Sequence, residues 1–347
     1  MSTSPDSKRA RTEKSSKKVI GTHNGTFHCD EALAVFLLRL TDQYKGSSLI
    51  RTRDSAILDK CDVVVDVGAV YDVHTQRFDH HQRGFGEVFG HGFTTKLSSA
   101  GLIYKHFGEE IIASRLGFPP EDARIQILYL KLYSEFIEGI DAIDNGIEQY
   151  ETALEPKYKI RTDLSSRVGW LNPPWNKSPE SYSIDDLFLT ASNLTGTEFL
   201  DRLDYYGKSW LPARDLVATA LQSRASVHPS QRIAIFEVFA PWKEHLFDLE
   251  TELKILDDSH PYYVLYPDEF GGTWRIQAVP VNPASFQSRL ALPEDWRGVR
   301  DDDLSKKTGV PGCVFVHASG FIGGNKTREG ALEMASIALK IQRPETT

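Results

Sequence analysis

Hydrophobic and polar positions change their spacing repeatedly over the first half of the chain. Short apolar runs predict strands at residues 18–21, 48–52 and 62–68, and the valines of the last run are typical of a parallel strand buried on both faces. Helical spacing predicts helices at residues 32–40, 97–107 and 123–143, whereas residues 82–95 contain four glycines and predict a mobile loop. Strands that alternate with helices favour an α/β fold.

The second half begins with a segment of different composition. Residues 161–179 are rich in proline, serine and asparagine, with two prolines between Trp170 and Trp175, which predicts an ordered connector. Helices are then predicted at 184–203, 211–224 and 328–339, and strands at 232–237, 262–266, 274–280 and 312–317. We therefore expect a tail at residues 1–17, an α/β domain at 18–160, a connector at 161–182 and a smaller α+β domain at 183–347.

Charge is distributed unevenly along the 347 residues. The chain has 40 lysines and arginines against 48 aspartates and glutamates, a formal charge of −8. Residues 1–18 hold six basic and two acidic side chains, a balance of +4, so the remaining chain carries −12. This tail cannot bury enough apolar surface to offset its ordering entropy, and we expect it to be disordered.

The basic residues of the tail also predict a location in the cell. Lys8, Arg9 and Arg11, with Lys17 and Lys18 downstream, resemble a bipartite nuclear-localisation signal, and a solvated basic tail is the alternative. Two acids interrupt the tail, which disfavours a mitochondrial presequence. We expect the nucleus, including the nucleolus, with the cytoplasm or the mitochondrion as alternatives.

Composition excludes several classes of protein. No apolar run approaches the ~20 residues that cross a bilayer, so we expect no membrane partner. Three cysteines cannot build a disulfide framework, which favours a reducing compartment.

Histidines and aspartates gather where the predicted strands end. His23 follows the first strand, His28 and Asp30 come soon after it, and Asp66 ends the valine-rich strand. Ligands of an open α/β sheet bind beyond the carboxyl ends of its strands, so we expect these side chains to lie together. Two further groups belong to the same set: Asp79, His80 and His81, and Asp141 and Asp144 near the end of a predicted helix.

This combination of side chains favours a metal site. Imidazole and carboxylate ligands together suit manganese, zinc, cobalt or iron better than calcium, and one aspartate can bridge two metals about 3.5–4 Å apart. Each residue alone has a plainer explanation. A strand-end histidine can be a satisfied polar group, Asp66 can belong to a turn, and Asp30 can complement a helix N-terminus.

The ordered motifs resemble those of the MYG exonuclease family (melanocyte proliferating gene product), within the DHH phosphoesterase superfamily. The matching segments are 21–31 (GTHNGTFHCDE), 64–68 (VVDVG), 78–83 (FDHHQR), 95–101 (TKLSSAG), 141–146 (DAIDNG), 171–175 (LNPPW) and 317–325 (HASGFIGGN). The resemblance implies a DHH-type catalytic domain with a parallel-rich sheet flanked by helices. A smaller α+β substrate-binding domain would follow it, with the active site in the cleft.

The resemblance also implies roles for the strand-end residues. Two divalent metals, usually manganese in the superfamily, would be bound. His23 and His28 would bind one metal and Asp30, His80 and Asp144 the other, with Asp66 between them and Asp141 as the alternative to Asp144. His81 would contact the scissile phosphate or assist the leaving group, and Asp79 would orient the histidines. Most of the superfamily has an aspartate at the position of His28, and the neutral imidazole shifts the metal preference toward a softer ion.

Glycines and basic residues near the C-terminus form a second candidate site. Gly323 and Gly324 offer backbone amides to a phosphate, before a helix whose N-terminus favours anions. The segment resembles the glycine-rich signature that holds substrate in DHH-associated domains, and a plain strand-to-helix turn is the alternative. The substrate-binding residues predicted with these glycines are His317, Asn325, Lys326 and Arg328. Aromatic side chains such as Trp170, Trp175 and Trp274 can stack on bases, but tryptophans are more often core.

The resemblance implies a metal-dependent 3′–5′ exonuclease. Its main substrate would be single-stranded RNA, with DNA as a further one, and it would release mononucleotides in RNA processing. A small-molecule phosphoesterase that hydrolyses oligonucleotides, pyrophosphate or a nucleotide is the alternative. A non-enzymatic scaffold is disfavoured, because a structural zinc site is usually a closed four-ligand cage. The acidic body argues against a large nonspecific grip on nucleic acid, and the sequence indicates no obligatory protein partner.

Overall fold

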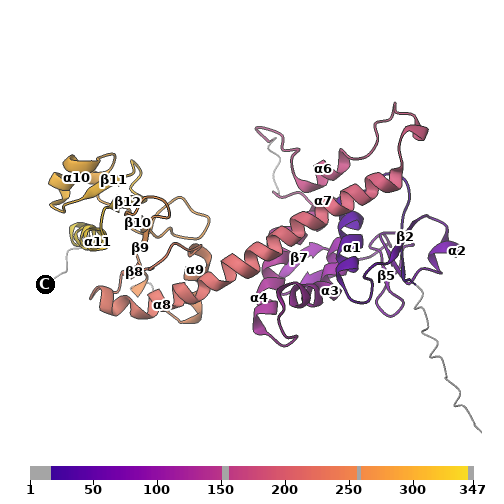
Figure 1. Cartoon of the computed structure of the whole chain (residues 1–347), viewed down its shortest axis with the longest axis horizontal. Coiled ribbons are helices and arrows are strands. Elements are labelled where there is room, and N and C mark those ends of the chain that lie inside the picture. The colour runs from indigo at the N-terminus through magenta and orange to yellow at the C-terminus, as the bar shows by residue number, and fades with distance from the viewer. Residues whose placement is uncertain (1–16, 151–155, 256–258, 343–347) are drawn as a thin grey trace, which may run out of the picture. The chain divides into compact units, whose positions relative to one another are not determined.

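The structure is a computed structural model that describes residues 17–150, 156–255 and 259–342. The predicted disordered tail and its basic signal lie almost entirely outside the described residues. The chain divides into two compact units, Met1–Gly207 and Lys208–Thr347 (Figure 1). Among the described helices, none is both long and apolar enough to cross a membrane.

A mostly parallel five-stranded sheet organises the first unit. Its strands stand in the order β2-β1-β3-β5-β4. They comprise β1 (Val19–Thr22), β2 (Ser48–Arg51), β3 (Val63–Val65), β4 (Tyr71–Asp72) and β5 (Arg77–Phe78). β1, β2, β3 and β5 pair in parallel, and only β4 runs antiparallel to its neighbour. All three valines of β3 are buried, as expected for a strand covered on both faces. The predicted α/β class is confirmed.

Helices surround this sheet. They are α1 (Cys29–Leu40), α2 (Ser55–Leu58), α3 (Ser99–Leu116), α4 (Ala123–Leu132), α5 (Glu138–Asp144), α6 (Leu164–Gly169) and α7 (Ile184–Tyr205). Nine of the twelve residues of α1 are buried, because α1 packs against both α3 and α7. The three segments predicted as helices in this region are helical, but the helix predicted at 123–143 contains a π-helical turn at Tyr133–Ile137.

The prediction of a mobile loop at residues 82–95 is wrong for its second half. Residues Val88–Gly90 and Phe93–Lys96 form an antiparallel hairpin, β6 and β7. Gly90 and Gly92 adopt positive φ angles of 94° and 92° in its turn, which glycine does without strain. Phe89 fixes the hairpin, because its ring stacks parallel on Tyr133 with the centroids 3.7 Å apart.

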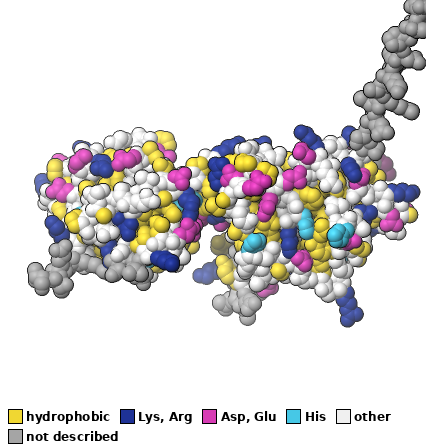
Figure 2. Space-filling model, turned by 90° about the horizontal axis from the view of Figure 1, so that it is seen from below, with side chains coloured by type: hydrophobic (Ala, Val, Ile, Leu, Met, Phe, Trp, Pro, Cys, Tyr) yellow, Lys and Arg dark blue, Asp and Glu magenta, His cyan; other side chains and the backbone are white. Residues whose placement is uncertain are grey.

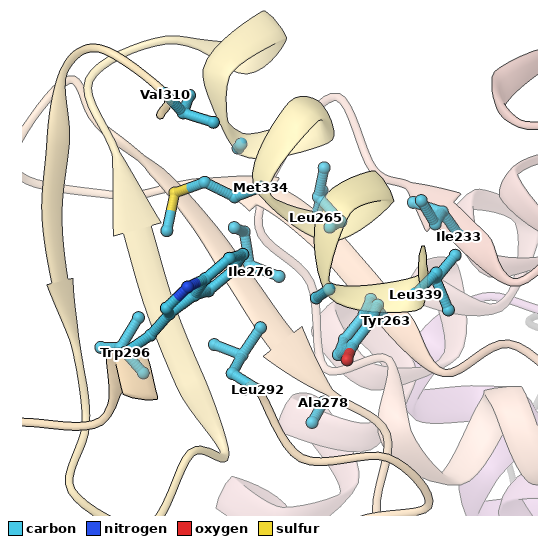
Figure 3. Close-up of a cluster of buried hydrophobic side chains, with 14 of the residues drawn as sticks. Ile233, Tyr263, Leu265, Ile276, Ala278, Leu292, Trp296, Val310, Met334 and Leu339 are labelled. Carbon is cyan, nitrogen blue, oxygen red and sulfur yellow. The ribbon is translucent and has the colours of Figure 1, made fainter. Parts of the chain in front are cut away.

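A second five-stranded sheet organises the second unit, in the order β11-β12-β10-β9-β8. Its strands are β8 (Ile233–Ile235), β9 (Tyr263–Pro267), β10 (Trp274–Ala278), β11 (Cys313–Val316) and β12 (Ile322–Asn325). Its helices are α8 (Leu211–Val227), α9 (Lys243–Glu252), α10 (Asp301–Thr308) and α11 (Arg328–Gln342). Met334 and Leu339 of α11 pack with Ile276 and Leu265 of the sheet in a continuous apolar core (Figure 3).

The division between the units lies after α7, whereas the sequence led us to expect the second domain from residue 183. The reason is the packing of α7 on α1. Phe188, Ala191 and Phe199 of α7 are buried, and Gly196 meets Phe36 so closely that a Cβ there would lie 2.0 Å from the ring. The connector contains α6 and a 3₁₀ turn at Pro179–Ser181, and α6 packs against α1 and α7 within the first unit.

Candidate metal centre

The carboxyl ends of three parallel strands bring the predicted residues together. His23 follows β1, Asp66 follows β3 and Asp79 follows β5. The N-terminus of α1 adds His28 and Asp30 to this edge, and α5 ends on Asp144. His80 follows Asp79 directly, and we define the strand-end cluster as the six predicted metal ligands: His23, His28, Asp30, Asp66, His80 and Asp144.

Asp66 lies at the centre of the strand-end cluster. One carboxylate oxygen, Oδ2, is 3.3 Å from Nε2 of His23, and the other, Oδ1, is 3.2 Å from Nε2 of His80. The same nitrogen of His80 is 3.1 Å from Oδ2 of Asp144. Each oxygen of Asp66 thus faces a different histidine, and its predicted role as a bridging ligand stays a prediction.

The backbone of Asp66 is held in an uncommon conformation. Its φ angle is 58°, in the left-handed region that aspartate tolerates better than most side chains. Its amide donates to the carbonyl of Phe78 at 3.1 Å, so β5 fixes the turn. Backbone strain of this kind is concentrated at functional sites, because the surrounding structure must stabilise it.

Three groups of side chains present ligand atoms within 4.8 Å of one another. They are His23, His28, Glu31 and Asp66; Asp66, Asp79, His80 and His81; and His28, Asp30 and Asp144. Every predicted metal ligand belongs to at least one group, and Asp66 belongs to two. These residues could hold metal ions, and most of them line a pocket of about 880 Å³ in the first unit. Figure 2 shows histidine side chains beside acidic and basic ones on the surface of this unit.

Unsatisfied buried atoms indicate that the groups fit a cation. Oδ1 of Asp30, Oδ1 of Asp66 and both ring nitrogens of His80 are buried without a hydrogen-bond partner. The distance between His80 and Asp66 is short, but the pair lacks hydrogen-bond geometry. Such groups cost free energy unless something pairs with them, and a divalent metal pairs with carboxylate and imidazole lone pairs together.

Burial and neighbouring charges shift the pKa values of the strand-end cluster in opposite directions. Burial lowers the pKa of His23, but hydrogen bonds with Asp66 and Glu31 outweigh it and raise the pKa to about 10. Burial also lowers the pKa of His80, but Asp66 and the neighbouring acids outweigh it and raise the pKa to about 9. Burial raises the pKa of Asp144 to about 8. Asp66 differs, because its histidine partners overcome burial and hold its pKa at about 2.

Asp141 and Asp144 have different partners. Asp141 is fully buried, and its Oδ1 accepts hydrogen bonds from the amide and hydroxyl of Ser98 and from the amide of Gly101. Its Oδ2 accepts a hydrogen bond from the hydroxyl of Tyr133 at 3.1 Å. Asp141 therefore caps the N-terminus of α3, and Asp144 is the one of the two that reaches His80.

Asp79 and His81 form a pair at the edge of the cluster. Oδ1 of Asp79 is 2.7 Å from Nδ1 of His81 and accepts from its amide, while Oδ2 accepts from the amide of Ala69. The His81 side chain is 59% exposed and lines the pocket, so it is open to a ligand. The catalytic roles predicted for both residues stay predictions.

Sequence reasoning missed three residues at this edge. Glu31 is fully buried, accepts from the amide of His28 at 2.9 Å and lies 3.1 Å from Nε2 of His23. Its position three residues after His28 signals a capping box, which explains its helix role but not its contact with a histidine. Arg53 lines the pocket two residues after β2, where the strand-end rule predicts ligand contacts. Ser99 donates to Asp30 at 2.7 Å.

The substrate-binding set predicted in the second unit has a different setting. Gly323 and Gly324 are not in a turn but in β12, where they pair with both β10 and β11. Asn325 is fully buried; its Nδ2 donates to the carbonyl of Pro311 at 2.9 Å and its Oδ1 accepts from the amide of Thr327 at 3.0 Å. Three members of the set remain exposed or partly exposed: His317, Lys326 and Arg328. Their predicted role stays a prediction.

Fold and site together define an α/β protein with a candidate metal centre at the edge of a parallel sheet. Residues 19–339 match the family described as MYG1_exonuc, an uncharacterised protein family (UPF0160). The chain belongs to this MYG1 exonuclease family, as the resemblance in its motifs led us to expect.

Relatives from distant organisms match nearly the whole chain. The "MYG1 protein" of Dictyostelium discoideum is 51% identical over 94% of this chain and 98% of its own length. The "MYG1 exonuclease" of Homo sapiens is 51% identical over 96% of this chain and 89% of its own length. The "MYG1 protein YER156C" of Saccharomyces cerevisiae is 44% identical over 96% of this chain and 98% of its own length. No solved structure shows a significant match.

Proposed function

We propose that the chain is a metal-dependent phosphodiesterase that acts as a 3′–5′ exonuclease on single-stranded RNA and releases mononucleotides. The observation that carries the proposal is Asp66, whose two oxygens face His23 and His80 in a pocket with unsatisfied carboxylates. Mammalian relatives about 50% identical to the chain are named exonucleases, which supports the same class of reaction. The motif resemblance to the MYG exonuclease family supports the direction and the RNA preference.

The strand-end cluster would hold two divalent ions, which we propose to be manganese. His23, His28 and Asp66 would bind one ion, and Asp30, Asp66, His80 and Asp144 the other. When bound, such ions polarise a water molecule and neutralise charge on the phosphoryl group. Glu31 is a further acid within reach of the first position.

His81 is the group of the chain best placed to serve the leaving oxygen. Asp79 lies 2.7 Å from its Nδ1, which keeps a proton on that nitrogen and leaves Nε2 to exchange one with the substrate. Arg53, the basic side chain of the pocket lining, offers a charge-assisted hydrogen bond to a phosphate.

A small-molecule phosphoesterase is the second candidate, and two observations favour it. The pocket volume lies within the range of small-ligand sites, so a single nucleotide or a dinucleotide would fill it. The formal charge of −8 also disfavours a long polyanion unless basic residues are placed locally.

One assay separates the two candidates. Purified protein with manganese is offered end-labelled RNA, end-labelled DNA, a dinucleotide and pyrophosphate, beside the variants Asp66→Asn and His80→Ala. We expect a ladder ending in mononucleotides from RNA labelled at its 5′ end, and loss of the ladder in both variants. Cleavage of the dinucleotide or pyrophosphate alone would favour the second candidate. Equal activity in wild type and variants would defeat the metal mechanism.

We also propose a nuclear location, on the basis of the basic residues among the first 18. A fluorescent fusion of the full chain tests this against a variant in which Lys8, Arg9 and Arg11 are alanine. Nuclear exclusion of the variant alone is the expected result, and an unchanged distribution would contradict the proposal.

A further inference from the structure

A basic and aromatic segment borders the pocket of the first unit. Residues 156–178 contain five lysines and arginines against one aspartate, in a chain with a formal charge of −8. Three large aromatic side chains of the segment are exposed: Tyr158 by 74%, Trp170 by 64% and Trp175 by 96%. The interpretation of these tryptophans as core residues is therefore wrong. Exposed rings of this size within one short segment are typical of a surface that contacts a ligand.

The segment is fixed to the pocket. Ser165, Ser166 and Gly169 of α6 line it, and Trp170 follows Gly169 directly. Asn172 adds two hydrogen bonds with the backbone of Phe27, another residue of the pocket lining.

Asn172 holds the segment against the loop that carries the predicted metal ligands. Its Nδ2 donates to the carbonyl of Phe27 at 2.9 Å, and its Oδ1 accepts from the amide of Phe27 at 3.1 Å. Phe27 immediately precedes His28, so the attachment reaches the strand-end cluster. Two prolines between Asn172 and Trp175 restrict the backbone further. The two rings are therefore presented from a preorganised backbone, which lowers the entropic cost of binding.

We propose that residues 156–178 bind the single strand whose end enters the pocket, with Trp170 and Trp175 stacking on its bases. The inference rests on the proposed nuclease function and adds the surface that holds the substrate outside the pocket. Stacking tolerates any sequence, since every base has a π face, and it requires bases that are not already paired in a duplex. Arg167 already forms an ion pair with Glu198, and the other lysines and arginines of the segment supply positive charge that complements the phosphates. This charge favours a nucleic acid over a protein partner as the occupant.

Binding is measured separately from hydrolysis, with the full chain in EDTA and a labelled single-stranded oligoribonucleotide by fluorescence anisotropy. We expect Trp170→Ala and Trp175→Ala each to weaken binding roughly 5- to 100-fold, and the matching phenylalanine variants to retain most of it. Phe286→Ala is the matched control, because Phe286 of the second unit is also fully exposed, and it should bind as wild type. A duplex of the same sequence should show no dependence on either tryptophan.

Alanine variants that fold, by thermal melting, and bind the single strand as wild type does would overturn the inference. So would an altered oligomeric state in sedimentation without loss of RNA binding, since that outcome assigns the surface to a protein contact. Hydrolysis with manganese is recorded in parallel. A wild type that binds through the tryptophans but hydrolyses no RNA overturns the proposed exonuclease function and supports the binding surface.

Discussion

Buried polar groups lack hydrogen-bond partners in the strand-end cluster of the first unit but have them at the corner between β12 and α11 in the second unit. In the cluster, Asp30, Asp66 and His80 bury atoms that have no hydrogen-bond partner. At the corner, the amide of Asn325 both donates and accepts within the unit. Both regions combine glycines with polar residues in the sequence. The structure shows that only the first leaves buried polar atoms that a ligand would satisfy.

Among the substitutions that test this contrast, Asp66→Asn should have the largest effect. The change leaves the shape of the side chain but removes the charge that faces His23 and His80. We expect hydrolysis to fall more than about 100-fold and the metal content of the purified protein to fall with it, since loss of even an outer-sphere partner costs 10–100-fold. Elemental analysis beside the ladder assay checks both. Full metal content with no activity would assign Asp66 to catalysis rather than to binding.

The pH dependence of metal binding is the next test. The raised pKa values of about 10 for His23 and about 9 for His80 mean that both histidines are protonated near neutrality in the metal-free protein. Their protons stabilise the metal-free fold fully below about pH 6.5, and this contribution is lost as pH rises through about 9 to 10.

Metal must displace these protons, so affinity should rise with pH by about tenfold per unit for each proton released. Calorimetric titration with manganese at several pH values, in buffers of different ionisation enthalpy, measures the number released. An affinity that does not change between about pH 6 and about pH 8 would contradict the assignment of these histidines as ligands.

Asn325→Ala tests the satisfied polar group at the corner between β12 and α11. The change leaves the carbonyl of Pro311 and the amide of Thr327 without their partner, which should cost about 1–3 kcal/mol in the free energy of unfolding. Urea denaturation measures it, with Lys326→Ala as an exposed neighbour expected to fall within about 0.5 kcal/mol of wild type. Wild-type stability combined with a loss of RNA affinity in Asn325→Ala would assign this residue to the substrate instead.

The smallest expected effect separates Asp141 from Asp144. Asp141→Asn should lower the free energy of unfolding by about 1 kcal/mol, because the hydrogen bonds that cap α3 weaken. Asp144→Asn should instead weaken metal binding, because this carboxylate, unlike that of Asp141, lies beside His80. Thermal melting with and without manganese distinguishes the pair. Equal responses of both variants to the metal would refute the division of roles.

The sequence predicts best where one physical rule decides the outcome. Parallel strands bring their carboxyl ends to one edge, so the neighbourhood of His23 and Asp66 follows from two strand assignments. The short strand β5, which brings His80 to the same edge, was not predicted. Partners distant in sequence are not predicted in this way. Phe89 stacks on Tyr133, and this contact turns an expected loop into a hairpin. Glu31 reaches His23 only because α1 begins where it does.

The glycines of the second unit show the limit of composition as a guide. Gly323 and Gly324 are compatible with a phosphate-binding turn, but in β12 a Cβ at either position would lie 3.0 to 3.1 Å from neighbouring side chains and carbonyls. Close packing, which the sequence does not reveal, accounts for both. Close packing also explains why α7 belongs to the first unit, because Gly196 of α7 lies directly against the ring of Phe36.

The π-helical turn at Tyr133–Ile137 lies between α4 and α5. The number of residues in this turn therefore decides where Asp141 and Asp144 of α5 are placed. A regular helix advances about 100° per residue, so losing the one extra residue of a π turn would rotate everything that follows it by that angle. Asp141 would leave the end of α3 and Asp144 would leave His80, although no functional side chain had been replaced. Over the stretch from Tyr133 to Asp144, substitutions can therefore be neutral where a single-residue deletion is not. The number of residues is therefore more strictly constrained here than their identity.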